Sequence, residues 1–167
     1  MRVLVLNVGS SSVKAAHVRV DGEAVRVAWR GGRERGDAAL AETLGALLAD
    51  PRALGPGVDA VGHRIVHGGR RFAAPVRLDE GTLDALEALG SLAPLHNPPA
   101  LAGARALRVR LPDVPAVAVF DTAFHADRPP EARRYALPAD VCEELDLLPF
   151  GFHGIAHSHA HVEHQTR

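Results

Sequence analysis

Two charged residues that could take part in binding a phosphate or a carboxylate group lie within or directly after apolar stretches of the chain. Arg64 stands inside the apolar stretch 58–66, and Asp121 directly follows the apolar run 114–120. A buried arginine needs a partner, and its planar guanidinium suits phosphate and carboxylate groups. In open α/β sheets, ligands bind beyond the carboxyl ends of the strands. We therefore expect Arg64, Asp121, His96 and His153 to converge at a ligand site. The alternative interpretation is a structural pairing of Arg64 with a buried carboxylate.

A second polar cluster occupies the turn that follows the first apolar run. Asn7 and Lys14 flank a stretch of glycine and serine residues. Gly9 permits a bend where a residue with a Cβ would clash, and small residues let backbone N–H groups approach an oxyanion. An amide and an ammonium beside such a turn favour phosphate binding. The turn is not a P-loop, because no GK[ST] follows. The alternative is an ordinary β-hairpin with a serine-rich turn.

Histidines form a third group of candidates. His96 lies in a proline-rich loop and His153 in a glycine-flanked one. His153, His157 and His161 are four residues apart, so they would share one face of a helix and could hold zinc. The glutamate of the H-E-x-x-H motif is missing, so a compositional effect is the better interpretation of this histidine-rich segment.

Composition restricts the class of protein. The 167 residues are 47% hydrophobic and 23% charged, which fits one globular domain. A net charge of −1 gives no electrostatic reason to expect nucleic acid or an anionic membrane as a partner. The single cysteine, Cys142, excludes an internal disulfide framework and favours a reducing cytoplasm. We expect no signal peptide, and no apolar run reaches the roughly 20 residues of a membrane-spanning helix.

The elements that must position these residues alternate between strands and helices. Strands are predicted at 3–6, 13–20, 24–29, 58–66 and 114–120, the first three as an antiparallel meander. Gly31-Gly32 and Gly36 mark a loop after the meander. Helices are predicted at 40–48 with Asp37 as N-cap, at 80–89 with Asp79, at 98–107 with Asn97, at 139–145 and from about Ile155. This alternation predicts an α/β domain.

Five motifs in order cover essentially the whole chain. They are NVGSSSVK (7–14), HRIVHGG (63–69), LAPLHNP (92–98), FDTAFH (120–125) and GFHG (151–154). In this order they resemble acetate kinase, of the acetate and sugar kinase/Hsp70/actin superfamily. The resemblance implies a ribonuclease-H-like (actin-like ATPase) α/β domain, with a mixed sheet, an initial antiparallel meander and flanking helices. It also implies transfer of the γ-phosphoryl group of ATP to acetate, giving ADP and acetyl phosphate, with Mg²⁺ or Mn²⁺ as cofactor.

The resemblance assigns a role to each candidate residue. Arg64 would clamp the carboxylate or the phosphoryl group, with His96 beside the carboxylate and His153 stabilising the phosphoryl group. Asp121, with Asn7, would hold the metal or orient the nucleophile. The nucleotide phosphates would contact Asn7, Ser10, Ser12 and Lys14. The walls of a small apolar pocket for the acyl methyl group would be Val66, Leu95 and Phe152.

The resemblance also implies a missing part. The family is more than twice as long as this chain, so we expect residues 1–167 to be one amino-terminal domain without the nucleotide-binding half. The usual Thr-Ser after GFHG is Ile155-Ala156 here. We expect an acyl/phosphoryl half-site with little activity alone. The alternatives are a non-catalytic remnant that binds a partner chain or a small anion, a split-enzyme subunit that binds the missing half or a second copy, and a propionate or butyrate kinase.

Overall fold

A six-stranded mixed sheet forms the centre of the computed structural model, which describes residues 1–34 and 38–165. The strand order is β3-β2-β1-β4-β6-β5. The strands are β1 (Arg2–Val8), β2 (Ser12–Asp21), β3 (Ala24–Glu34), β4 (Ala60–Ile65), β5 (Val76–Arg77) and β6 (Ala116–Phe120). β1, β2 and β3 form the predicted antiparallel meander, and β1, β4 and β6 are parallel neighbours. The short strand β5 had no sequence signal.

The predicted loop at Gly31-Gly32 is wrong, because both glycines belong to β3. Gly31 pairs with Ala15 in the β2–β3 register. A Cβ on Gly31 would lie 2.3 Å from the Trp29 ring, so this glycine gives the buried indole its space. The other predicted signals of this region, Gly36 and the cap Asp37, lie outside the described residues.

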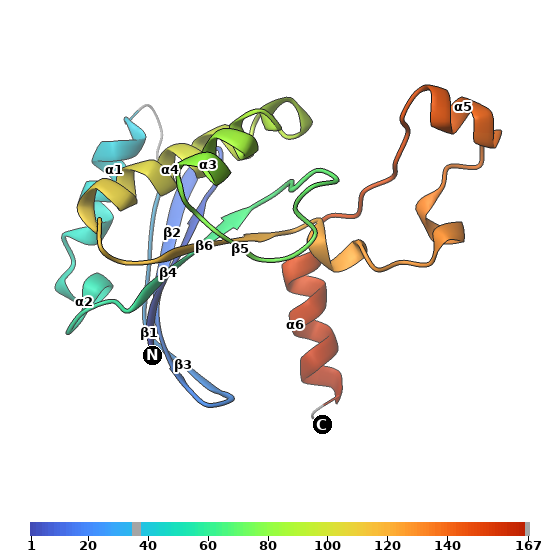
Figure 1. Ribbon diagram of the computed structural model, residues 1–167. Helices are drawn as coiled ribbons and strands as arrows, with labels where there is room; N and C mark the ends of the chain where they lie inside the picture. Colours follow the sequence, from blue (N-terminus) through green and yellow to red (C-terminus); the bar gives the residue numbers. More distant parts are fainter. Residues whose placement is uncertain (35–37, 166–167) are drawn as a thin grey trace.

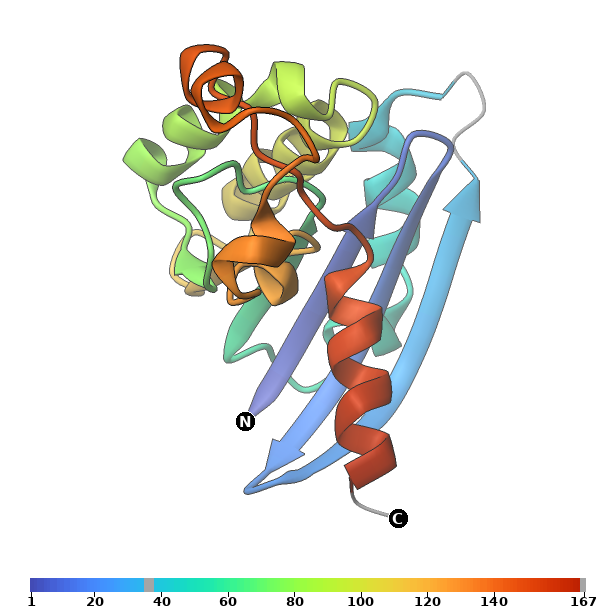
Figure 2. The ribbon, with the colours of Figure 1, turned by 90° about the vertical axis from the view of Figure 1, so that its right-hand side faces the viewer.

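Helices lie on both sides of the sheet. They are α1 (Leu40–Leu48), α2 (Pro51–Leu54), α3 (Glu80–Glu87), α4 (Asn97–Arg110), α5 (Ala139–Glu144) and α6 (Gly154–Gln165), with short 3₁₀ turns η1 (Gly90–Leu92), η2 (Ala123–His125) and η3 (Pro130–Arg133). Helices α1, α3 and α4 cover one face, and α6 stands on the opposite side (Figures 1 and 2). Residues 127–150 project as an arm with α5 at its tip (Figure 1). No helix in the described ranges is long and apolar enough to cross a membrane.

The core lies between the sheet and α1, α3 and α4, in two clusters. The first joins apolar residues of β1, such as Leu4 and Leu6, to Leu44 of α1. The second joins Ile65 and Phe120 to apolar residues of α3 and α4. Burial alternates along β4, with every second side chain from position 61 to 65 buried under the helices. Arg64 therefore faces the other side of the sheet.

Both predicted helix caps within the described residues can be compared with the structure. Asp79 caps α3 as expected, because its Oδ1 accepts a hydrogen bond from the Thr82 backbone N–H at 2.8 Å. The Asn97 cap is wrong. Asn97 is the first residue of α4, His96 precedes it, and the Asn97 side chain is fully buried. Its amide bonds to a neighbouring loop instead.

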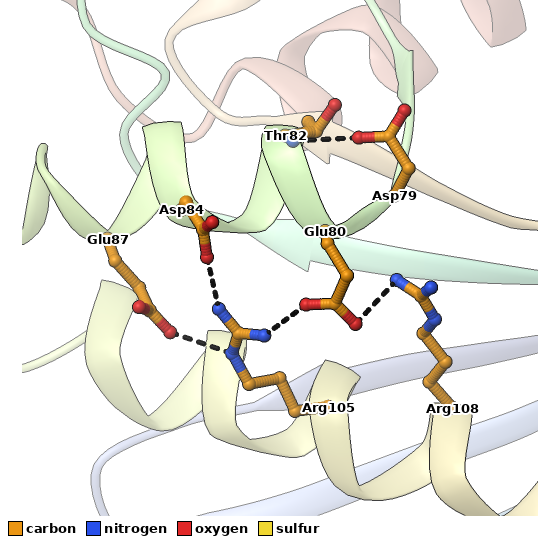
Figure 3. A network of polar contacts seen from close by, with 7 residues as sticks. All are labelled: Asp79, Glu80, Thr82, Asp84, Glu87, Arg105 and Arg108. Carbon is orange, nitrogen blue, oxygen red and sulfur yellow. Dashed lines mark hydrogen bonds and ion pairs between the residues drawn. The ribbon is translucent and has the colours of Figure 1, made fainter.

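An arginine of α4 holds α3 against it (Figure 3). Arg105 lies within 2.8 Å of three carboxylates that follow one face of α3, those of Glu80, Asp84 and Glu87. Arg108, one turn later, lies 3.1 Å from the second oxygen of Glu80. These three carboxylates raise the pKa of Arg105, mainly through the hydrogen bond to Glu87. The pairing fixes the two helices that cover the sheet behind Arg64.

Candidate active site

Arg64, Asp121 and Asn7 meet where three parallel strands end. The Nε of Arg64 donates to both carboxylate oxygens of Asp121, at 3.2 and 3.1 Å, and Nη2 donates to Oδ2 at 2.5 Å. The Nη1 of Arg64 donates to Asn7 Oδ1 at 3.1 Å. Asn7 lies near the end of β1, Arg64 near the end of β4, and Asp121 directly after β6. The sheet topology thus brings together Asn7, Arg64 and Asp121, each of which is 57 positions from the next in the sequence.

Burial explains why this contact is tight. Asp121 is 2% exposed, so its carboxylate has little water to pair with. Its backbone N–H donates to the Ile65 carbonyl oxygen at 3.1 Å, which extends the β4–β6 pairing to Asp121. Breaking a buried pair leaves an uncompensated charge, so Arg64 and Asp121 depend on each other structurally as well. The contact confirms the structural pairing of Arg64 with a buried carboxylate, and the ligand site stays a prediction.

A buried layer under the site was missed by the sequence interpretation. The His67 backbone N–H donates to Asn97 Oδ1 at 3.1 Å, and Asn97 Nδ2 returns a bond to the His67 carbonyl at 2.9 Å. Thr122 Oγ1 accepts from the Gly68 N–H at 3.1 Å. These bonds join the loops after β4 and β6 to the start of α4. Burial lowers the pKa of His67, which is 3% exposed. The one available signal was Asn97, whose amide we assigned to a helix cap.

The GFHG segment packs directly on the residue that follows β6. The Gly154 N–H donates to the Asp121 carbonyl oxygen at 2.9 Å. A Cβ on Gly154 would lie 2.2 Å from that oxygen, so a residue other than glycine cannot keep this contact. His153 precedes it with φ +58°, an uncommon left-handed conformation for a non-glycine residue. His153 itself is exposed.

The remaining candidates of the acyl side are more exposed. Leu95 is 70% exposed and Phe152 is 43% exposed, whereas Val66 is half-buried at the end of β4. The Phe152 ring meets the His67 ring edge-on, with centroids 5.7 Å apart. His96 is exposed immediately before α4. Val66 and the Phe152 ring thus lie at the loop that follows β4, whereas Leu95 and His96 lie in the segment before α4.

The glycine–serine turn is an ordinary hairpin in its backbone geometry. The Gly9 N–H donates to the Ser12 carbonyl at 2.8 Å. A Cβ on Gly9 would lie 3.5 Å from that oxygen, an ordinary contact, so the expected need for glycine is wrong. Ser10 is exposed and Ser12 is half-buried. Lys14 lies opposite Asn7 in the β1–β2 register, and both border an open hollow of about 460 Å³.

The histidine-rich helix α6 begins at the site. The His157 ring lies 5.7 Å from the His125 ring and 6.2 Å from the Phe124 ring, by centroids. The His125 Nε2 also lies 3.0 Å from the Phe152 carbonyl oxygen. Within residues 1–34 and 38–165, no three His, Cys, Asp or Glu side chains are placed to hold a metal ion. The structure therefore does not assemble the three-histidine zinc site.

The donor set at Arg64 fits a magnesium ion that keeps water and phosphate oxygens as its other ligands. Asn7 Oδ1 and Asp121 Oδ1 each accept one hydrogen bond from Arg64, which leaves each oxygen a further lone pair. Mg²⁺ commonly binds through one or two protein oxygens together with substrate phosphates. Carboxylate and amide oxygens also suit Mn²⁺.

Comparison with known proteins finds relatives among acetate and propionate kinases. The family model of the acetokinase family matches residues 32–167. The acetate kinase of Arthrobacter sp. (strain FB24) is 42% identical to the chain in an alignment that covers 99% of the chain and 46% of that protein. A crystal structure of Porphyromonas gingivalis acetate kinase superposes with a TM-score of 0.77 and 34% identity, and a propionate kinase from Francisella tularensis with 0.73 and 32%. Each superposition covers 93% of this chain and 46% of the other.

These structures share the actin-like ATPase fold, so the predicted fold class is confirmed. The chain spans about half the length of the relatives that it matches. The chain belongs to the acetokinase family.

Proposed function

We propose that this chain carries the acyl and phosphoryl half of an acetate kinase cleft. The reaction is the in-line transfer of the γ-phosphoryl group of ATP to acetate, giving ADP and acetyl phosphate. The observation that carries the proposal is the contact of Arg64 with Asp121 and Asn7 at the carboxyl ends of β4, β6 and β1. Family membership supports it, since the matched relatives are acetate kinases.

Arg64 supplies the positive charge of the proposed site. Phosphoryl transfer depends on positioning and on charge stabilisation at the equatorial oxygens. A guanidinium that is already oriented by Asp121 and Asn7 meets this need without reorganising. The side chain of Arg64 is 31% exposed, so it can reach a ligand on the open side of the sheet. The acetate carboxylate is itself charged, and no strong general base is required.

His96, His153 and the apolar residues complete the acyl side of the proposal. His96 donates to the carboxylate, and His153 stabilises the phosphoryl group in transfer. The exposed apolar surfaces of Leu95 and Phe152, with Val66, exclude water around the methyl group. One methylene changes discrimination by only about 1–3 kcal/mol, so propionate and butyrate are the related substrates to compare.

The metal and the phosphates of the nucleotide contact the amino-terminal hairpin in this proposal. Asp121 and Asn7 hold Mg²⁺, or Mn²⁺, which shields the negative charge of the phosphates when bound. Ser10, Ser12 and Lys14 contact the ATP phosphates from the turn beside Asn7. We place the reaction in the cytoplasm, in keeping with a single cysteine that is not in a disulfide.

Residues 1–167 act as one amino-terminal domain in this proposal, and the adenosine site comes from a second unit. An arginine that stabilises the transition state contributes about 10³–10⁵-fold to phosphoryl transfer, so a half-cleft has little turnover alone. The alternative is a non-catalytic role in which this surface binds a partner chain or a second copy. The exposed rings of Phe124 and Phe152, at 44% and 43%, favour that alternative.

Binding of acetyl phosphate to the purified chain tests the proposal. Amide NMR signals of Asn7, Arg64 and Asp121 should shift and saturate, and the Arg64→Gln variant should lose the effect. Arg70→Gln is the matched control, because Arg70 is an exposed arginine whose guanidinium pairs with Asp146 of the arm. Arg64→Lys keeps the charge without the two-pronged geometry and should bind at least tenfold more weakly. Unchanged shifts in Arg64→Gln would overturn the proposal.

A further inference from the structure

The buried side chain of Asn97 joins two segments that carry residues of the proposed acyl pocket. Its Oδ1 accepts the His67 backbone N–H at 3.1 Å, and its Nδ2 donates to the His67 carbonyl oxygen at 2.9 Å. We call these two hydrogen bonds the Asn97–His67 clasp. His67 directly follows Val66, and Leu95 and His96 directly precede Asn97. The clasp therefore fixes the start of α4 against the loop after β4, next to the proposed pocket residues of both segments.

The clasp depends on the primary amide of Asn97. An amide carries a donor and an acceptor side by side, so one side chain can pair with both backbone groups of His67. Without it, a buried N–H and a buried C=O lose their partners, and the loop must shift to find others. The Gly68 N–H, bonded to Thr122 Oγ1 at 3.1 Å, still ties the loop to the segment after β6. Loss of the amide thus frees the loop from α4 and leaves its link to β6 in place.

The ring of His67 carries the same constraint to Phe152. Its Nδ1 accepts the Gly69 backbone N–H at 2.9 Å, which fixes the ring relative to its own loop. The ring lies edge-on to the Phe152 ring, with centroids 5.7 Å apart, and to the Phe150 ring at 4.4 Å. Aromatic rings attract each other at these separations. Phe152 therefore packs against a ring whose backbone is held by Asn97.

We propose that Asn97 is a positioning residue that sets the width of the acyl pocket, and thereby the length of the acyl group that the pocket accepts. The inference rests on the proposed function. Asn97 is 0% exposed, so it does not touch the substrate and acts through His67 on Val66 and Phe152. With the clasp intact, these residues keep a fixed spacing from Leu95 that suits a methyl group. With the clasp broken, the spacing widens and the preference for the shorter acyl group falls.

Amide NMR titration of the purified chain with acetyl phosphate, propionyl phosphate and inorganic phosphate tests this inference. The parent chain should bind acetyl phosphate more tightly than propionyl phosphate, because a fitted pocket discriminates one methylene by about 10–200-fold. In Asn97→Ala the ratio of these two affinities should move towards propionyl phosphate by about tenfold. The affinity for inorganic phosphate, which has no acyl group, should change by less than about twofold, as expected for independent sites.

Leu107→Ala is the matched control, because Leu107 is buried on the same helix in the other core cluster. It should lower stability and leave the ratio unchanged. Asn97→Ser replaces Asn97→Ala if the alanine variant does not fold, and the same change is expected because the shorter side chain cannot reach both His67 groups. An unchanged ratio in the folded variant, or an equal change in Leu107→Ala, would overturn this inference alone. An absence of saturable binding by the parent chain would overturn the proposed function, and this inference with it.

Discussion

The backbone N–H of Gly154 donates a hydrogen bond to the carbonyl oxygen of Asp121, with the nitrogen 2.9 Å from the oxygen. This contact fixes the start of α6 to the same residue whose carboxylate pairs with Arg64. The backbone and the side chain of Asp121 therefore link two distant motifs to β4. His153, one residue before Gly154, is placed by this link.

Replacing Gly154 by alanine should detach the start of α6. The new Cβ would lie 2.2 Å from the Asp121 carbonyl, so the hydrogen bond cannot survive unchanged. We expect the free energy of unfolding to fall by about 2 kcal/mol, the usual range for overpacking. Urea denaturation and hydrogen exchange of the residue 154 amide measure this. Gly81→Ala in α3 is the control, where a Cβ meets ordinary contacts and should stabilise slightly. Equal stability of Gly154→Ala and the parent chain would contradict the contact.

Removing the guanidinium of Arg64 should destabilise the domain. The Arg64→Ala variant leaves the nearly buried Asp121 carboxylate without its cation. We expect a loss of about 2–3 kcal/mol, reduced from the range for fully buried pairs because Arg64 is 31% exposed. The double variant Arg64→Ala/Asp121→Leu should recover part of this loss. Chemical denaturation of the parent, Arg64→Ala, Asp121→Leu and the double variant measures the coupling, and additive effects would show that the pair is not coupled.

Acid should destabilise the protein through His63. Burial lowers the pKa of His63 to about 4, against 6.5 for the free side chain. Between these values the unfolded chain binds a proton that the folded chain does not, so the free energy of unfolding falls as the pH drops from 6.5 towards 4. At pH 5 the loss should be about 2 kcal/mol. Denaturation of the parent and His63→Phe at pH 7 and pH 5 measures it. A pH dependence as steep in His63→Phe as in the parent would rule out this residue as the cause.

The Arg105 network should contribute to stability in a salt-dependent way. Arg105→Ala removes the cation shared by three carboxylates of α3 (Figure 3). The melting temperature should fall by a few degrees at low salt, and the difference should shrink at high salt because the pairs are partly exposed. Calorimetry at two ionic strengths measures both effects, with Arg26→Ala as the exposed control. A salt-independent difference would point to packing of the arginine stem instead.

Hydrophobic patterning predicted five of the six strands and the antiparallel meander, but neither the strand order nor β5. Asn7 and Arg64 are the next-to-last residues of β1 and β4, Asp121 directly follows β6, and parallel pairing brings these positions together. The Arg64–Asp121 contact follows from that topology. The Asn97–His67 pair was not predictable, because an asparagine before a proline also reads as a helix cap, and only tertiary packing decides between the two. Gly31 was also misassigned, because it lies inside β3, where the ring of Trp29, two residues earlier, and the side chain of Leu47 from α1 fill the space that a Cβ would take.

The most direct test of the central claim is an acyl-phosphate assay of the purified chain with ATP, Mg²⁺ and acetate, in which hydroxylamine traps acetyl phosphate. The claim is that this chain carries one half of the cleft. The account predicts no product above that of the Arg64→Ala variant when the chain is assayed alone. Arg64-dependent formation of acetyl phosphate by the chain alone would contradict it.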